Sequence, residues 1–218
     1  MTFEEARKHM VKVQVARRGV RDEKILAAME AVPREVFVKA EFGEFAYQDS
    51  PLPIGEGQTI SQPYIVAAMI QAAQLLPGDR VLDVGAGSGY AAAVISRLVP
   101  HVFAVERLKA LTMAADERCR ALGYHNVAFR TGDGSLGWPG EAPFDSILVA
   151  AGVPKPPEAL KHQLKIGGRL IVPVGGASEQ RLLRVRRMSE TEFHGEDFGA
   201  VRFVPLIGAQ GWPDDSES

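Results

Sequence analysis

The chain has 218 residues, of which 46% are hydrophobic and 24% charged, and its net charge is −2. These values are ordinary for a single globular domain, and they disfavour nucleic-acid binding, which usually needs a basic surface. No apolar run reaches the roughly 18 residues of a membrane span, and the charged N-terminus is not a signal peptide. With a single cysteine, Cys119, no internal disulfide framework can form. We therefore expect a cytoplasmic protein.

The first third of the chain reads as helices around a loop. Residues 3–18 place apolar side chains at helical spacing, and Asp22 is a typical N-cap for a second helix. Residues 49–58 are rich in proline and glycine, which predicts a loop, and loops this long are more often functional than idle. Residues 63–76 again carry an apolar stripe at helical spacing.

Strands and helices then alternate. The strands are predicted at 80–84, 101–106, 126–131, 144–150 and 168–174. The helices between them are predicted at 90–98, 108–122 and 157–164. This alternation indicates a parallel sheet with helices on both faces. Two further strands, 182–188 and 200–206, are separated only by the polar stretch 189–199, which suits an antiparallel hairpin.

These elements predict an α/β fold with a mostly parallel, seven-stranded sheet. We expect one domain over residues 1–212. Within it, residues 1–62 form an N-terminal helical segment and a binding loop, and residues 63–212 form the core. The polar, acidic residues 213–218 are expected to be a flexible tail.

The stretch 81–90, Val-Leu-Asp-Val-Gly-Ala-Gly-Ser-Gly-Tyr, is a glycine-rich turn between a strand and a helix. Such a turn usually marks a nucleotide-type site at the carboxyl end of a sheet, although a tight turn without a ligand is the simpler alternative. Dinucleotide sites have the wider spacing Gly-x-Gly-x-x-Gly, whereas here Gly85, Gly87 and Gly89 alternate. Asp83 would repel a pyrophosphate but would suit a cation.

Two further carboxylates follow the next strands. Glu106 ends the second strand and could accept hydrogen bonds from both ribose hydroxyls. Asp133, followed by Gly134, comes after the third strand and could accept from an adenine amino group. Each could instead be a solvated loop carboxylate. Together with Asp83 they predict a site for a cationic nucleoside without phosphates, which S-adenosylmethionine is.

At this point the chain resembles the class I S-adenosylmethionine-dependent methyltransferases, which have a Rossmann-like fold. The resemblance lies in residues 81–89, in Phe-Asp-Ser-Ile-Leu-Val at 144–149, in residues 164–170 and in the terminal hairpin. It implies S-adenosylmethionine as methyl donor and S-adenosylhomocysteine as product.

The acceptor is suggested by the string Pro-Ile-Gly-Glu-Gly-Gln-Thr-Ile-Ser-Gln-Pro at 53–63. This string closely resembles the signature of the protein-L-isoaspartate O-methyltransferases, and the resemblance extends to residues 22–38, 125–134 and 201–206. It implies methylation of the free carboxyl group of isoaspartyl residues in damaged proteins. The methyl ester would then collapse to a succinimide, whose hydrolysis restores some normal aspartate.

The same resemblance implies that Ser61 contacts the acceptor carboxylate and that Val204 and Pro205 lie close to the bound peptide. The simpler alternatives are that Ser61 is a helix N-cap and that residues 204–205 belong to an ordinary edge strand. Gln58 and Thr59, on the same loop as Ser61, are expected to help to bind the cofactor and align the reactants.

An ionised carboxylate is already a nucleophile at neutral pH, so this chemistry needs neither a general base nor a metal ion. We expect isoaspartyl proteins and peptides as partners, no nucleic acid or membrane, and a monomer. Three alternatives stay open: a methyltransferase for RNA or a small molecule, a nicotinamide-dependent dehydrogenase, and a binding protein without activity. The basic strand around Arg184 is the feature that an RNA-modifying enzyme would use.

Overall fold

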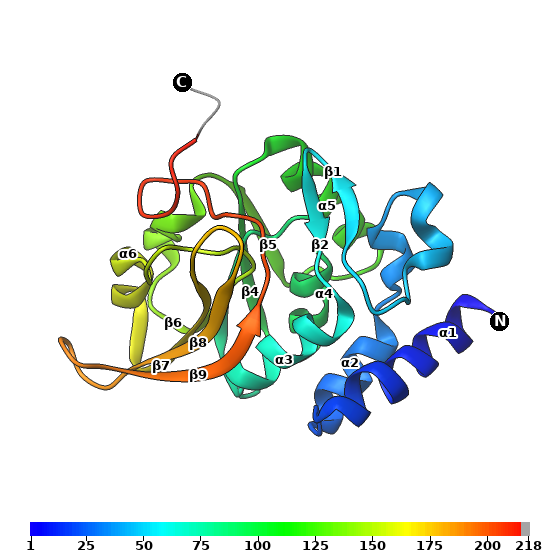
Figure 1. Cartoon of the computed structure of the whole chain (residues 1–218), viewed down its shortest axis with the longest axis horizontal. Helices are drawn as coiled ribbons and strands as arrows, with labels where there is room; N and C mark the ends of the chain where they lie inside the picture. The colour runs from blue at the N-terminus through cyan, green and yellow to red at the C-terminus, as the bar shows by residue number, and fades with distance from the viewer. Residues whose placement is uncertain (215–218) are drawn as a thin grey trace.

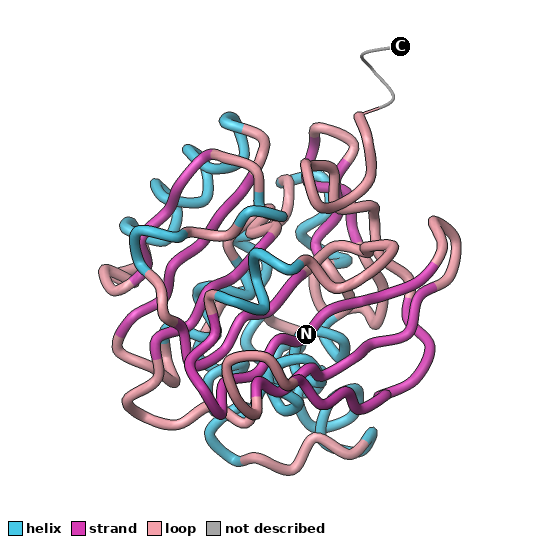
Figure 2. Tube along the Cα trace, turned by 90° about the vertical axis from the view of Figure 1, so that its left-hand side faces the viewer, coloured by secondary structure: helices cyan, strands magenta, loops and turns pink. Residues whose placement is uncertain are grey.

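A seven-stranded sheet forms the centre of the molecule in the computed structural model, which describes residues 1–214 (Figures 1 and 2). Its strands are Arg80–Val84 (β3), His101–Glu106 (β4), Val127–Thr131 (β5), Phe144–Val149 (β6), Leu164–Gly175 (β7), Gln180–Arg187 (β8) and Phe193–Val201 (β9). They lie in the order β5-β4-β3-β6-β7-β8-β9. The first five run parallel, whereas β8 is antiparallel to β7 and β9 to β8. The mostly parallel sheet with an antiparallel C-terminal hairpin is confirmed.

Six α-helices accompany the sheet within the described residues. They are Phe3–His9 (α1), Glu23–Ala31 (α2), Pro63–Ala73 (α3), Tyr90–Ser96 (α4), Lys109–Ala121 (α5) and Glu158–His162 (α6). Shorter helical turns include Arg34–Phe37 (η3) and Ala40–Phe45 (η4), and a separate hairpin is formed by Leu52–Gly55 (β1) and Gln58–Ile60 (β2). Figure 1 shows α1 and α2 at one end of the molecule, where α2 packs against α3 and α4, and the β1–β2 hairpin lies above them in this view.

The alternation of side chains along β3 divides the core into two halves. Val81 packs on the face covered by α3, α4 and the N-terminal helices. Leu82 and Val84 pack on the opposite face, against Leu160 of α6. Asp83 has the same parity as Val81, so its carboxylate is directed to the face that α3 covers.

The N-terminal elements form as their sequence predicts. Residues 3–18 are continuously helical, although α1 changes to a π-helical turn at Met10–Val15 and ends in a 3₁₀ turn. The run stops at Gly19, whose φ of 103° is accessible mainly to glycine. The Asp22 side chain accepts a hydrogen bond from the Lys24 N–H and caps α2.

The predicted strand at 200–206 is wrong. The second strand of the hairpin is β9, at Phe193–Val201, which occupies most of the stretch expected to be a connection. As an edge strand β9 is exposed along much of its length, so no apolar alternation marks it in the sequence. Its pairing with β8 is supported instead by ion pairs of Arg181 with Asp197 and of Arg184 with Glu196.

Residues beyond β9 return to the centre of the molecule as an extended segment. Gly152, just after β6, donates a hydrogen bond to Val204 O and accepts one from Leu206 N, both at 2.8 Å. Of the tail expected to be flexible, residues 215–218 lie outside the described part of the chain, and Asp214 forms an ion pair with Arg107.

Candidate active site

The glycine-rich turn lies at the carboxyl end of β3, at the centre of the sheet. Gly85, Gly87 and Gly89 all have positive φ, of 82°, 53° and 87°, a backbone path that other residues rarely follow. The turn is held by hydrogen bonds from the N–H groups of Gly85 and Ala86 to Val105 O of β4. The carboxyl ends of β3, β4 and β6 therefore surround one open cleft, lined by Gly85, Gly87 and Ala150.

Asp83 supplies the buried charge of this cleft. Its side chain is 1% exposed, and one carboxylate oxygen, Oδ2, has no hydrogen-bond partner among the described residues. Burial, together with the negative charge of Glu106, raises the pKa of Asp83 to about 7. A buried carboxylate with a free oxygen is costly unless a cation binds to it. The site therefore fits the cationic part of S-adenosylmethionine.

Glu106 is fixed at the end of β4 by the backbone around it. Its two oxygens accept hydrogen bonds of 2.9 Å from the N–H groups of Gly87 and Leu108. It lines the cleft next to Gly87 and Gly134. A carboxylate oxygen can accept more than one hydrogen bond, so Glu106 keeps the capacity to bind the two hydroxyls of a ribose.

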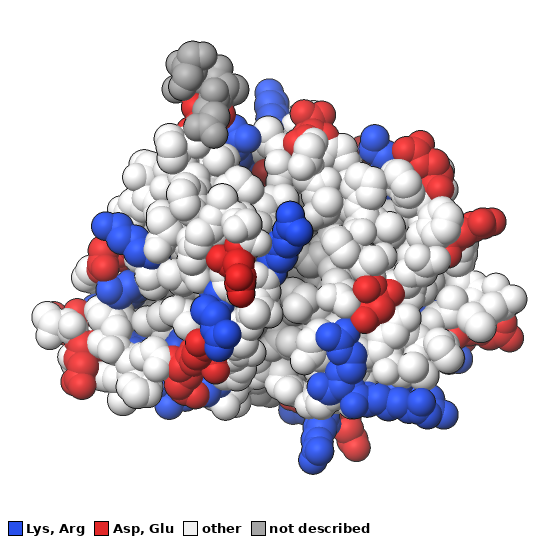
Figure 3. All heavy atoms as spheres, viewed as in Figure 1, with Lys and Arg blue, Asp and Glu red and all other residues white. Residues whose placement is uncertain are grey.

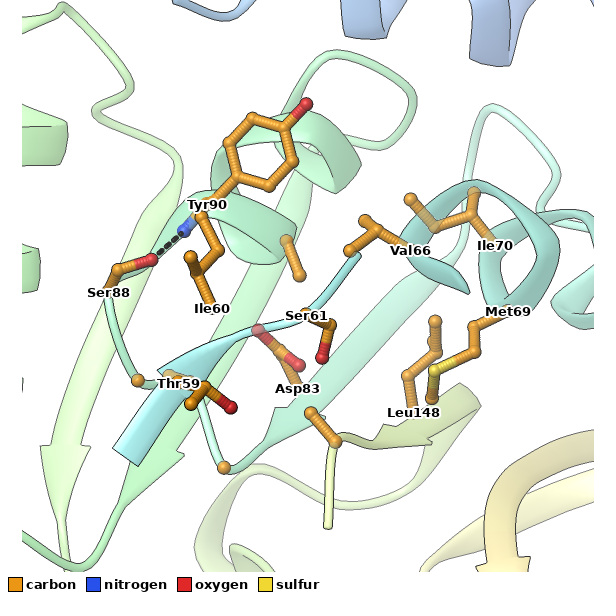
Figure 4. A pocket seen from close by; sticks show the side chains of 15 residues that line it. Thr59, Ile60, Ser61, Val66, Met69, Ile70, Asp83, Ser88, Tyr90 and Leu148 are labelled. Carbon is orange, nitrogen blue, oxygen red and sulfur yellow. Dashed lines mark hydrogen bonds between the residues drawn. The ribbon is translucent and has the colours of Figure 1, made fainter. Parts of the chain in front are cut away.

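The β1–β2 hairpin forms the roof of the cleft. Ile54 lies so close to the glycine-rich turn that a Cβ at Gly87 would be 3.2 Å from its Cδ1 atom. From β2 and the residue after it, Thr59 and Ser61 line the half of the cleft that holds Asp83, and Gln58 lines the half that holds Glu106. Figure 4 shows the oxygens of Thr59, Ser61 and Asp83 facing a common space.

Ser61 is not a helix cap. The N-cap of α3 is Gln62, and no side chain there bonds to the first turn. The helix begins with Pro63, which has no N–H to satisfy. The interpretation of Ser61 as an N-cap is therefore wrong, and its hydroxyl is left facing the cleft.

Asp133 is placed differently from the other carboxylates. Its Oδ1 accepts hydrogen bonds from the Ser135 N–H and hydroxyl, and its Oδ2 accepts one of 2.7 Å from the Ala209 N–H. It faces a neighbouring hollow beside Trp212, whereas its neighbour Gly134 lines the cleft. A contact of the Asp133 carboxylate with adenine stays a prediction.

The extended segment after β9 closes the cleft on the side of Glu106. Val204 and Pro205, predicted to lie near a bound peptide, line the same half as Gly134 and Gln58. Since Gly152 holds this segment, residues from both ends of the chain meet at the carboxyl edge of the sheet.

Sequence reasoning missed two parts of the site. One is an apolar wall beside Ser61, made by Val66, Met69 and Ile70 of α3 and Leu148 of β6. These side chains follow the ordinary pattern of a buried helix and strand, so nothing in the sequence separates them from the core. The other is Arg34, which is fully buried and donates a hydrogen bond to Ser61 O.

In residues 1–214, no group of three or more histidine, cysteine, aspartate or glutamate side chains is arranged to hold a metal ion. Over the same residues, no helix has the length and hydrophobicity required to cross a bilayer.

The basic side chains of β8 are engaged within the protein. Arg181 and Arg184 pair with carboxylates of β9, Arg186 donates to Gln74, and Arg187 donates to three backbone carbonyls. On the face drawn in Figure 3, acidic and basic groups are interspersed. Neither feature favours the RNA alternative.

The sheet, its glycine-rich turn and the buried acids define a class I S-adenosylmethionine-dependent methyltransferase. Residues 5–211 match the family model described as "Protein-L-isoaspartate(D-aspartate) O-methyltransferase (PCMT)". The chain belongs to this enzyme family.

Curated relatives and solved structures agree with the family. A Protein-L-isoaspartate O-methyltransferase 2 of Pelobacter propionicus is 55% identical over 94% of this chain and 92% of its own length. A Protein-L-isoaspartate O-methyltransferase of Brucella anthropi is 55% identical over 97% of this chain and 98% of its own length. A solved protein-L-isoaspartate O-methyltransferase superposes with a TM-score of 0.84 at 32% identity, over 94% of this chain and 66% of the longer solved chain. A Plasmodium falciparum protein, described as a protein-L-isoaspartate O-methyltransferase in complex with S-adenosyl-L-homocysteine, superposes with a TM-score of 0.80 at 26% identity. The match covers 92% of this chain and 98% of the solved chain.

Proposed function

We propose that this protein transfers the methyl group of S-adenosylmethionine to the free carboxyl group of L-isoaspartyl residues in damaged proteins and peptides. The observation that carries the proposal is that the Ser61 hydroxyl and the Asp83 carboxylate line one pocket, while the Ser61 hydroxyl is not used to cap α3. Asp83 binds the cationic end of the methyl donor, and Ser61 hydrogen-bonds the acceptor carboxylate and holds it in line.

The residues around this pocket suit a carboxylate acceptor. Neither half of the cleft is lined by histidine, lysine or cysteine among the described residues. An acceptor carboxylate, with a pKa near 4, is ionised at neutral pH and needs no base to remove a proton. The bound donor supplies a methyl group made electrophilic by its positive sulfur, and no metal is required.

The other residues predicted for the site have binding roles in this proposal. Glu106 accepts from the ribose hydroxyls, and Gly85, Gly87 and Gly134 allow close approach of the nucleoside. Gln58 and Thr59 close over the cofactor from the hairpin, and Asp133 accepts from the adenine amino group. Val204 and Pro205 lie close to the bound peptide.

The product methyl ester would leave the enzyme and cyclise to a succinimide, whose hydrolysis returns part of the material to normal aspartate. The role is then protein repair. We also propose that the protein acts as a monomer in the cytoplasm, without nucleic-acid or membrane partners.

The decisive experiment uses methyl-labelled S-adenosylmethionine and two peptides that differ only in an aspartyl or isoaspartyl linkage. The proposal expects base-labile label on the isoaspartyl peptide alone. Equal labelling of both peptides, or of neither, would refute it. Ser61→Ala should lower turnover strongly, whereas Ser178→Ala, at an exposed position that does not line the cleft, should leave it unchanged.

A further inference from the structure

Arg34 is a buried cation without an acidic partner. Its side chain is completely inaccessible to solvent, and no carboxylate among residues 1–214 forms an ion pair with it. Burial lowers the pKa of Arg34 to about 10, so it is still charged at neutral pH. A buried charge of this kind is costly, and it persists where its hydrogen bonds serve a purpose.

Those hydrogen bonds go to two backbone carbonyls. Nε donates to Ala46 O at 2.7 Å, and Nη2 donates to Ser61 O at 2.8 Å. The guanidinium carbon also lies 4.9 Å from the centre of the Tyr90 ring, at the start of α4. The third nitrogen, Nη1, is buried without a partner, so the two carbonyls are what this side chain binds.

The two carbonyls are the two ends of the roof. Ala46 precedes the β1–β2 hairpin and Ser61 follows it, so one guanidinium closes the base of the whole segment 46–61. Bringing the ends of a loop together costs conformational entropy, and a rigid fork that binds both ends offsets this cost. The segment is also bonded from outside by Gln14, which donates a hydrogen bond to Tyr47 O, and by Arg18, which forms an ion pair with Asp49 at the exposed surface.

Fixing the Ser61 carbonyl also fixes the direction of the Cα–Cβ bond that carries the hydroxyl, because the next residues, Gln62 and Pro63, are committed to the start of α3. We propose that Arg34 is a positioning residue, which holds the Ser61 hydroxyl in the acceptor site by clamping both ends of the hairpin. This inference rests on the acceptor role proposed above for Ser61.

An arginine in the pocket could both contact the acceptor directly and position Ser61, whereas Arg34 lies outside the pocket and can only position Ser61. Arg34 does not line the cleft, so it does not contact the acceptor. Its effect on methylation passes through the placement of Ser61, and displacements of about 1 Å can reduce a rate about 100-fold.

The test compares Arg34→Lys with wild type at saturating S-adenosylmethionine, which stabilises the folded form. Lysine keeps the charge but cannot span both carbonyls with a planar fork. We expect kcat/KM for the isoaspartyl peptide to fall at least about tenfold. The Kd for S-adenosylhomocysteine, measured by calorimetry, should rise by a smaller factor than kcat/KM falls, because Arg34 does not line the cleft and the cofactor residues Asp83 and Glu106 lie outside the clamped segment. The matched control is Arg18→Lys, which contacts the same segment from outside and should leave both quantities unchanged.

A double-mutant cycle distinguishes a residue that acts through Ser61 from one that only stabilises the fold. If Arg34 acts through Ser61, then Arg34→Lys should have little further effect on kcat/KM in the Ser61→Ala background. The inference is overturned if the two losses multiply, or if S-adenosylhomocysteine binding falls as much as peptide turnover.

Hydrogen exchange gives a second measurement that does not depend on activity. In cofactor-loaded Arg34→Lys, amides of 46–61 should exchange faster than in wild type, while those in the middle of α3 should not change. Equal exchange over 46–61 would also overturn the clamp. Failure of the proposed function would be visible separately, in the wild-type protein, as absence of isoaspartyl methylation.

Discussion

The buried carboxylate of Asp83 should make the cofactor-free protein less stable as the pH rises. Burial and the charge of Glu106 raise its pKa from 3.8 to about 7. The folded state therefore keeps a proton that the unfolded chain has already lost at the same pH. The resulting penalty is absent below the unfolded pKa, grows between pH 4 and 7, and is complete above pH 7.

The size of the penalty follows from the two pKa values. A rise of about three pKa units corresponds to about 4 kcal/mol when the carboxyl is ionised in both states. At pH 5 the same relation gives about 1.7 kcal/mol, so the penalty should increase by about 2.5 kcal/mol between pH 5 and pH 8.

Asp83→Asn removes the titrating group with little change in shape. We expect the free energy of unfolding of this variant, minus that of wild type, to increase by about 2–3 kcal/mol from pH 5 to pH 8. Urea denaturation without cofactor, at matched m-values, measures this difference. At pH 8 the variant should be more stable and yet bind S-adenosylmethionine more weakly, because the carboxylate that destabilises the empty site is the one that binds the cation.

Asp197→Asn is the control: Arg181 lowers the pKa of that exposed carboxyl below 3.8, so it is ionised in both states above pH 5 and the variant-minus-wild-type difference should not change between pH 5 and pH 8. If the Asp83→Asn difference is the same at pH 5 and pH 8, Asp83 ionises as it does in water. The assignment of a cation-binding role from its burial would then be refuted.

Three further substitutions or probes test other parts of the structure. Glu106→Gln should raise the Kd for S-adenosylhomocysteine by about tenfold or more, measured by calorimetry, since hydrogen bonds to a charged group contribute about 1.5–3 kcal/mol; unchanged affinity would remove Glu106 from the site. Gly134→Ala would put a Cβ 2.7 Å from Val84 Cγ1. It should lower the free energy of unfolding by about 1–3 kcal/mol in urea titrations, whereas Gly140→Ala, with no atom within 4 Å, should be nearly neutral. Cys119 is buried, and its thiol pKa is raised to about 12, so alkylation should be slow in the native protein and accelerate only with unfolding. Fast native labelling would contradict this.

The central sheet and the cofactor loop could be predicted because their signals are local. The glycines at 85, 87 and 89 are required by positive φ, and β3, β4 and β6 are buried along most of their length, so their sequences are mostly apolar. The resemblance at 53–63 also led correctly to the family. In each case the residues that carry the signal are adjacent in the chain.

The parts that could not be predicted depend on distant partners. The pairing of β9 with β8 is supported by ion pairs of its acidic side chains with the arginines of β8. Because β9 is an exposed edge strand, no alternation of apolar and polar residues marks it in the sequence. The carboxylate of Asp133 is bonded by Ala209, 76 residues away, which no pattern around Asp133 reveals. Nothing in the sequence around Arg34 distinguishes it from a surface arginine, and its burial is evident only in the folded structure.

The arrangement of charge in this site is consistent with the proposed reaction. Methyl transfer from a sulfonium to a carboxylate joins a cation and an anion and leaves two neutral products. Water stabilises the separated ions more than the partly neutralised transition state, so a dry pocket favours the transfer. The wall of Val66, Met69, Ile70 and Leu148, with the hairpin beside it, supplies an apolar surface of this kind. Among the described residues, Asp83 is the one carboxylate that lines this half of the cleft. Since the guanidinium of Arg34 is bonded to backbone carbonyls behind Ser61, its positive charge is kept out of contact with the acceptor, where it would stabilise the reactant anion and slow the transfer.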